Sequence, residues 1–180
     1  MIKFLRARLP SLADFLRVAS VAMVFLYGWT IVTWMWQLPS WMLSLTLDEI
    51  LSIFAYAMLD ALTESLVVLA CLLIPTVILP PRLLRDDFTV RASWSAIGLL
   101  APQLIFFMIF IRFGYGIALY LLPWTFATLA LTVLLPFLST KLAFMRAFAL
   151  WLSDRLQVFL YIFIPLTVIS LVVVLIRNLT

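Results

Sequence analysis

The chain has 180 residues, of which 67% are hydrophobic and 11% are charged, and its formal net charge is +4. Soluble domains are about half apolar and about a quarter charged, so this composition excludes an ordinary soluble protein and predicts an all-α integral membrane protein. The chain has no histidine and one cysteine, Cys71, which excludes histidine-ligated haem, a histidine-dependent catalytic triad and an intrachain disulfide.

The first predicted element is an amphipathic segment over residues 1–17 that lies along the cytoplasmic surface. Its apolar side chains recur at near-helical spacing among basic ones. The apolar set is Ile2, Leu5, Leu9, Leu12 and Leu16, and the basic set is Lys3, Arg6, Arg8 and Arg17. Ser11 followed by Asp14 resembles a capping box and predicts that a helix starts after Pro10.

Five segments are long and apolar enough to cross a bilayer, which takes roughly 20 residues. We predict spans at about 18–37, 50–79, 94–111, 117–138 and 156–176, within a single polytopic domain over 1–180. Between the last two spans, residues 141–155 predict a second amphipathic surface helix. Its apolar residues are Leu142, Met145, Phe148, Ala149 and Leu152, opposite Lys141 and Asp154.

The second span is longer than a bilayer requires. The 32 residues between Glu49 and Arg82 would form a straight helix of roughly 48 Å, against about 30 Å of hydrocarbon. Its outer half carries a polar stripe at i+4 spacing, formed by Asp48, Ser52, Tyr56, Asp60 and Glu64. Two architectures fit. Either residues 47–64 lie in the external interface and only 65–79 cross, or the whole helix crosses obliquely and the stripe faces the bundle or a hydrated cleft.

The basic residues predict the topology. Alternating the five spans places ten of the 12 Lys and Arg residues on one face, and leaves only Arg112 and Arg177 on the other. The positive-inside rule then predicts a cytoplasmic N-terminus and an external C-terminus. We interpret the positive charge as a topology signal, expect no nucleic-acid partner, and expect a bacterial inner (cytoplasmic) membrane as the location.

Asp60 and Glu64 are the strongest candidates for a functional site. Carboxylates inside a membrane usually face a protein interior or a wet cavity, because each costs roughly 2.5–3.5 kcal/mol on insertion scales. The pair could carry a proton or hold a hard cation, which prefers oxygen ligands. It could instead pair helices through an ion bridge with Arg112, although Arg112 is also placed to reach the external headgroups.

Thr125, Thr128 and Thr132 form a hydroxyl stripe on the fourth span that could supply further oxygens to such a site. Threonines in membrane helices commonly bond their own backbone or a neighbouring helix, and this is the interpretation we favour. The sequence contains neither a metal-ligand cluster nor a phosphate-binding loop, so we expect no metal and no cofactor.

Two functions fit these observations. We expect a small integral subunit that docks to and stabilises a larger membrane protein complex, with its apolar helices packed against other integral membrane subunits. The alternative is a homo-oligomeric ion or proton channel or transporter, in which copies of the chain use Asp60 and Glu64. No nucleophile–base set accompanies the carboxylates, so we expect no enzymatic activity and name no catalytic residue.

Overall fold

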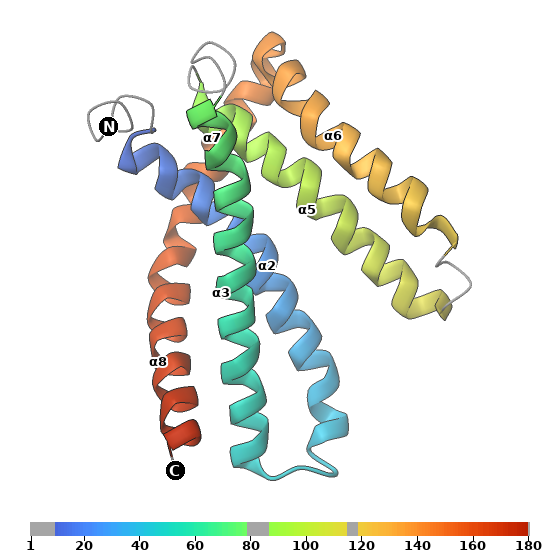
Figure 1. Ribbon diagram of the computed structural model, residues 1–180, viewed down its shortest axis with the longest axis vertical. Helices are drawn as coiled ribbons and strands as arrows, with labels where there is room; N and C mark the ends of the chain where they lie inside the picture. The colour runs from blue at the N-terminus through green and yellow to red at the C-terminus, as the bar shows by residue number, and fades with distance from the viewer. Residues whose placement is uncertain (1–9, 79–86, 115–118, 180) are drawn as a thin grey trace.

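The computed structural model describes residues 10–78, 87–114 and 119–179 of the chain, and within these ranges the secondary structure is helical, without a strand. Figure 1 shows the helices α2 (Leu12–Trp41), α3 (Leu47–Ile78), α5 (Phe88–Phe113), α6 (Leu121–Lys141), α7 (Ala143–Leu156) and α8 (Leu160–Leu179), with a 3-10 turn, η2 (Gln157–Phe159), before α8. Five helical stretches are long and apolar enough to cross a membrane, counting α7 to α8 as one. The predicted all-α class and the number of spans are confirmed, and they indicate a membrane-embedded protein.

The start of α2 confirms one local prediction, the helix start after Pro10. Ser11 is the N-cap: its hydroxyl accepts the backbone N–H of Asp14 at 3.1 Å and donates to the Asp14 carboxylate at 2.6 Å. The helix does not break at residue 18, because residues 12–17 are the first turns of α2, and the place of these turns along the membrane surface stays a prediction. Neither proline nor glycine interrupts these turns. Residues 1–9 lie outside the described part of the chain.

α2 contacts both parts of the fold, which are a bundle with α3 and α8 and a hairpin of α5 and α6. α2 packs against α3, α5, α7 and α8. Figure 1 shows α2, α3 and α8 running side by side, while the α5–α6 hairpin leans away from them. We call the end where α2 and α5 begin and α3 and α6 finish the α7 end. The far end carries the α2–α3 turn and the end of α8.

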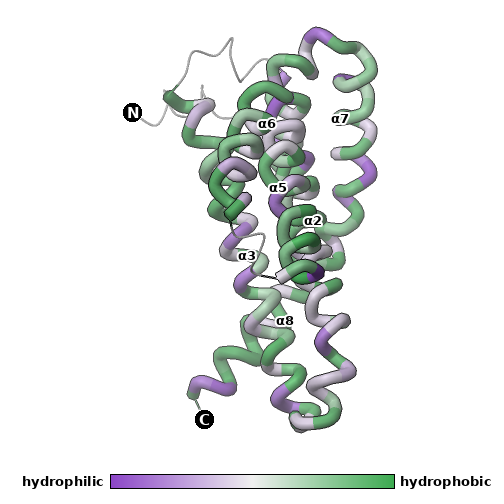
Figure 2. Tube along the Cα trace, turned by 90° about the vertical axis from the view of Figure 1, so that its right-hand side faces the viewer, coloured by the Kyte–Doolittle hydropathy of each residue, from purple (hydrophilic) through white to green (hydrophobic). Residues whose placement is uncertain are grey.

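Two apolar clusters form the core of this arrangement. The first joins α2, α3 and α5 through Val18, Ala22, Leu26, Leu69, Phe88, Ala92 and Leu100. The second joins α2, α3 and α8 through Met23, Tyr27, Met58, Ala61, Leu160 and Phe163. Figure 2 shows that hydrophobic residues continue along most of the helical trace. Many of the large ones are exposed, as expected for helices that face lipid or other apolar helices.

Small side chains allow the helices to pack closely at the α7 end. Ser20 of α2, Ser93 of α5 and Ser153 of α7 are all completely buried. The Ser20 hydroxyl donates to the carbonyl of Arg17 at 2.7 Å and lies 3.3 Å from the carbonyl of Ser153. The Ser153 hydroxyl donates to the carbonyl of Leu150 at 3.1 Å, whereas the buried Ser93 hydroxyl has no hydrogen-bond partner among the described residues. Small residues of this kind are typical of helix crossings within membranes. This crossing fixes α7 across the starts of α2 and α5.

Ion pairs reinforce the same end. Arg17 of α2 lies 2.9 Å from the carboxylate of Asp154 on α7, and Arg146 of α7 bonds Asp87, just before α5, at 2.7 Å. The Thr89 hydroxyl donates to Asp14 at 2.8 Å and so joins α5 to α2. Two of the described cations at the α7 end, Arg17 and Arg146, are therefore paired with carboxylates of the same chain.

α3 is one continuous helix of 32 residues, with Pro75 inside its last turns. A helix of this length spans roughly 48 Å. It has no break after Glu64, so the architecture in which residues 47–64 form a separate interfacial helix is not found. The polar stripe therefore belongs to a single long helix that packs against α2 and α8.

Candidate functional site

Asp60 and Glu64 lie on the outward face of α3. Both side chains are exposed, whereas Met58, Ala61 and Ser65, which alternate with them in sequence, are buried against the bundle. The exposed neighbours of the two carboxylates include Thr63, whose hydroxyl donates to the carbonyl of Leu59 at 3.0 Å, and apolar side chains. Val67, one turn further along the helix, is 57% exposed. The arrangement is two acidic groups on a hydrophobic helix face that nothing in the described chain covers.

The length of α3 places both carboxylates at mid-helix. Asp60 is 13 residues from the first residue of α3, roughly 20 Å, and Glu64 is 14 residues from the last, roughly 21 Å. The hydrocarbon layer is about 30 Å thick. A layer of that thickness placed anywhere within the helix includes both carboxylates. If α3 crosses the membrane, Asp60 and Glu64 lie inside its hydrocarbon layer.

The carboxylates do not form the predicted ion bridge with Arg112. Of the described residues, only those at the α7 end form salt bridges, and Asp60, Glu64 and Arg112 take part in none. Arg112 lies in the last turn of α5, where its guanidinium is 6.0 Å from the Phe113 ring centroid and lines a cleft beside α2. The second predicted role of Arg112, contact with headgroups, is compatible with this position.

The polar stripe is divided between two surfaces. A step of four residues turns about 400° around an α-helix, so an i+4 row drifts by about 40° per step. From Asp48 to Glu64 the drift reaches about 160°, nearly half a turn. Ser52 consequently faces the bundle and is buried, while Glu64 faces outward. The stripe therefore does not line one hydrophilic wall, as the sequence suggested.

The first three residues of the stripe, Asp48, Ser52 and Tyr56, lie beside the end of α8. The Tyr56 hydroxyl and the Asn178 side-chain amide are hydrogen-bonded, with 3.0 Å between the hydroxyl oxygen and the amide nitrogen. Asp48 and Ser52 line a shallow pocket that Arg177 also lines, and the Ser52 hydroxyl donates to the carbonyl of Asp48 at 2.7 Å. Asn178 and Arg177 were missed by the sequence reasoning. The predicted topology places the start of α3 and the end of α8 on the same side of the membrane, and this could have indicated that these residues lie close together.

The hydroxyl stripe of α6 bonds its own backbone. The hydroxyls of Thr125, Thr128 and Thr132 each donate to the carbonyl four residues earlier, at 2.8–2.9 Å. Thr128 is buried. Ser95 of α5 lies 3.3 Å from the Thr132 carbonyl, which Pro136 leaves without its usual helical donor. These contacts match the structural interpretation of the stripe and tie α6 to α5.

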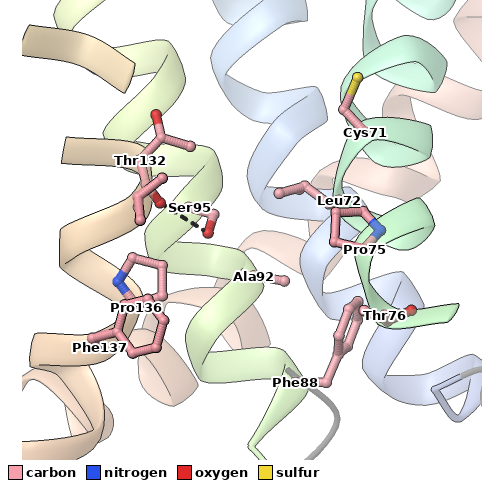
Figure 3. A pocket seen from close by; sticks show the side chains of 11 residues that line it. Cys71, Leu72, Pro75, Thr76, Phe88, Ala92, Ser95, Thr132, Pro136 and Phe137 are labelled. Carbon is pink, nitrogen blue, oxygen red and sulfur yellow. Dashed lines mark hydrogen bonds between the residues drawn. The ribbon is translucent and has the colours of Figure 1, made fainter. Parts of the chain in front are cut away.

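A groove between α3 and α6 continues the outward face of α3 toward the α7 end. Figure 3 shows Cys71 and Pro75 of α3 on one side of this groove and Phe137 of α6 on the other, with Ala92 of α5 between them. The enclosed volume is about 330 Å³ and the lining is mostly apolar. Cys71 and Pro75 follow Glu64 by seven and eleven residues, so all three lie on one side of the helix. The carboxylates and the groove therefore form one continuous surface.

Comparison with protein-family models, with curated proteins and with solved structures finds no match to this chain. The chemistry of the site is therefore argued from its geometry. In the described part of the chain, no three Cys, Asp or Glu residues gather closely enough to hold a metal ion. Two carboxylates on successive turns can accept hydrogen bonds from a cationic side chain, take up protons, or share a cation with ligands from another chain.

Proposed function

We propose that the protein is a small integral subunit that docks to a larger membrane protein complex through the outward face of α3. The observation that carries the proposal is the exposure of Asp60 and Glu64 at mid-helix. Left in lipid, each carboxylate costs roughly 2.5–3.5 kcal/mol on insertion scales. A partner that covers the pair with donors removes this cost, and the role is one of binding and not of catalysis.

The partner chemistry that fits best is a transmembrane helix with a Lys or Arg at the depth of the carboxylates. A guanidinium can bond a carboxylate bidentately, and such charge-assisted bonds are about twice as strong as neutral ones. Apolar side chains of the same helix would enter the groove beside Cys71 and Pro75, where the small side chain of Ala92 leaves room for them. Charge would select the partner and the groove would set its register.

We further propose that the α7 end is cytoplasmic, with the N-terminus on that side and the C-terminus outside. Basic residues support this orientation: the α7 end carries Arg17, Arg91, Lys141, Arg146 and Arg155, and the far end carries Arg112 and Arg177. α7 would then lie at the cytoplasmic headgroup boundary as the predicted surface helix. A bacterial inner membrane fits the same asymmetry.

The alternative function is a homo-oligomeric ion or proton channel or transporter. The same outward pair favours it, because copies packed through α3 would gather several carboxylates around a shared axis. The charges weigh against it. The described cations lie near helix ends or on α7, so the described part of a second copy offers no basic group at the depth of Asp60 and Glu64. Such an assembly would need protons or cations between its subunits.

Gentle extraction of the tagged protein from its own membrane, followed by native mass spectrometry, tests the proposal. We expect a fixed stoichiometry with at least one other membrane protein. The double substitution Asp60→Asn and Glu64→Gln should weaken this association by 100-fold or more, since removing one side of a buried charge pair costs roughly 3–5 kcal/mol. The matched control neutralises Asp48 and Glu49 at the start of the same helix and should retain the partner.

Two results would contradict the subunit proposal. One is a native mass equal to a multiple of 20.6 kDa, together with ion flux in liposomes that the double substitution abolishes. That result would establish the homo-oligomeric alternative. The other is unchanged co-purification of the double variant, which would show that the partner binds elsewhere on the molecule.

A further inference from the structure

A second surface of the molecule has the shape and charge of a ligand site. It is the cleft between the far-end halves of α2 and α5. The two helices pack closely near the α7 end, where Val18 and Ala22 of α2 join Phe88 and Ala92 of α5 in one apolar cluster. Toward the far end they diverge, and Figure 1 shows the α5–α6 hairpin leaning away from α2. The space between them has a volume of about 690 Å³, within the usual range of roughly 300–1,000 Å³ for ligand sites.

The described lining of the cleft is mostly apolar and includes one cation, Arg112, near the far end of the molecule. Its α2 wall includes Trp29, Val32 and Trp36, and its α5 wall includes Met108 and Arg112. Arg112 belongs to the last turn of α5, so it marks the end of the cleft that lies nearest to the membrane surface if α5 crosses the bilayer.

Arg112 has unused hydrogen-bonding capacity. Within the described residues it forms no salt bridge, and its one recorded contact is with the neighbouring Phe113 ring. Thr33, also in the lining, already uses its donor, because its hydroxyl lies 3.0 Å from the backbone carbonyls of Trp29 and Thr30. A ligand in this cleft would therefore meet largely apolar walls, the indole N–H groups of Trp29 and Trp36, and one guanidinium.

We propose that this cleft binds an anionic phospholipid, with the phosphate on Arg112 and an acyl chain between Trp29 and Met108. The guanidinium presents a fork of donors that matches a phosphate, and tryptophans are suited to the boundary between headgroups and chains. The described lining of the cleft contains no carboxylate, so the ammonium group of a zwitterionic lipid finds no acceptor of opposite charge among these residues. This favours a lipid with net negative charge, such as phosphatidylglycerol.

Charge distinguishes this cleft from the outward face of α3, because its described lining holds a guanidinium and no carboxylate. The inference does not depend on the docking role proposed for α3.

The test is a lipid titration of the purified, delipidated full-length protein by native mass spectrometry. Phosphatidylglycerol and phosphatidylethanolamine with identical chains are the two probes. We expect phosphatidylglycerol to bind more tightly, and Arg112→Gln to weaken its binding about 10- to 100-fold, as expected for loss of hydrogen bonds to a charged group. Arg177→Gln, at the other cationic position of the far end, is the matched control and should bind as the wild type does.

A second variant tests the cleft independently of the charge. Val32 is 53% exposed on the cleft wall, so Val32→Trp should fill the space without disturbing the core and reduce binding of both lipids. Unchanged phosphatidylglycerol binding in both Arg112→Gln and Val32→Trp would overturn the proposal. So would equal losses in Arg112→Gln and Arg177→Gln, or a photo-crosslinker at position 32 that traps a polypeptide in the native membrane in place of lipid.

Discussion

The buried hydrogen bond between Tyr27 of α2 and Thr167 of α8 gives a quantitative test of the bundle formed by α2, α3 and α8. The two hydroxyl oxygens are 2.6 Å apart, and Tyr27 is completely buried. The Thr167 hydroxyl also donates to the carbonyl of Phe163 at 2.7 Å. Since a hydroxyl has one proton to donate, Tyr27 must be the donor in the bond to Thr167.

This direction predicts unequal effects for the two substitutions that break the bond. Tyr27→Phe keeps the ring, which stacks on Phe163 with centroids 4.7 Å apart, and leaves Thr167 with its own donor satisfied. We expect it to lower the free energy of unfolding by about 0.5–1.5 kcal/mol. Thr167→Val leaves the buried Tyr27 hydroxyl without an acceptor and should cost about 1–3 kcal/mol. The double variant should be less destabilised than the sum of the two.

Reversible unfolding of the purified protein in mixed detergent micelles measures these differences. The wild type, the two single variants and the double variant form a double-mutant cycle. This cycle should give a coupling energy near 1 kcal/mol between Tyr27 and Thr167. The reasoning is refuted if the two single effects add within about 0.3–0.5 kcal/mol. It is also refuted if Thr167→Val is no more harmful than Tyr27→Phe, because the assigned donor direction would then be wrong.

Further predictions concern the hairpin and the orientation. A Cβ at Gly98 would lie 3.1 Å from the backbone of the facing α6 helix, so Gly98→Ala should cost about 1–3 kcal/mol in the same unfolding assay. Gly28→Ala meets nothing within 4 Å and should be neutral or slightly stabilising, through helix propensity. For the orientation, we expect Ser44→Cys in a cysteine-free background to react with an impermeant maleimide from outside intact cells, and Ala147→Cys to react only after permeabilisation. The reverse pattern would contradict the proposed topology.

The sequence predicted the helices well because their signal is local. Hydropathy identified five spans, and the Ser11–Asp14 pair predicted the start of a helix at the correct place. The helix limits were less accurate, since hydropathy falls where polar side chains begin but the backbone hydrogen bonds continue. α5 therefore starts at Phe88, six residues before the predicted third span.

The site was harder to predict because it depends on how each helix is rotated and aligned with its neighbours. The i+4 spacing of the polar stripe suggested one shared face, yet the drift of the row places Ser52 inside and Glu64 outside. The bonds from Tyr56 to Asn178 and from Tyr27 to Thr167 join residues more than 120 positions apart. Such pairs are fixed by helix packing, which a single sequence does not specify.

The strongest support for a docking role comes from comparing the charges of the α7 end with those of α3. At the α7 end, Arg17 contacts Asp154 and Arg146 contacts Asp87, although water and headgroups would tolerate these groups there if the helices cross a bilayer. Asp60 and Glu64 are at mid-helix, where an unpaired charge costs most, and none of the described cations meets them. The ion pairs are thus found at the α7 end, where they stabilise the protein least. They are missing at Asp60 and Glu64, where an ion pair would stabilise it most. This contrast follows directly if the missing cation belongs to another protein, because the surface around the carboxylates must then stay open in the isolated chain.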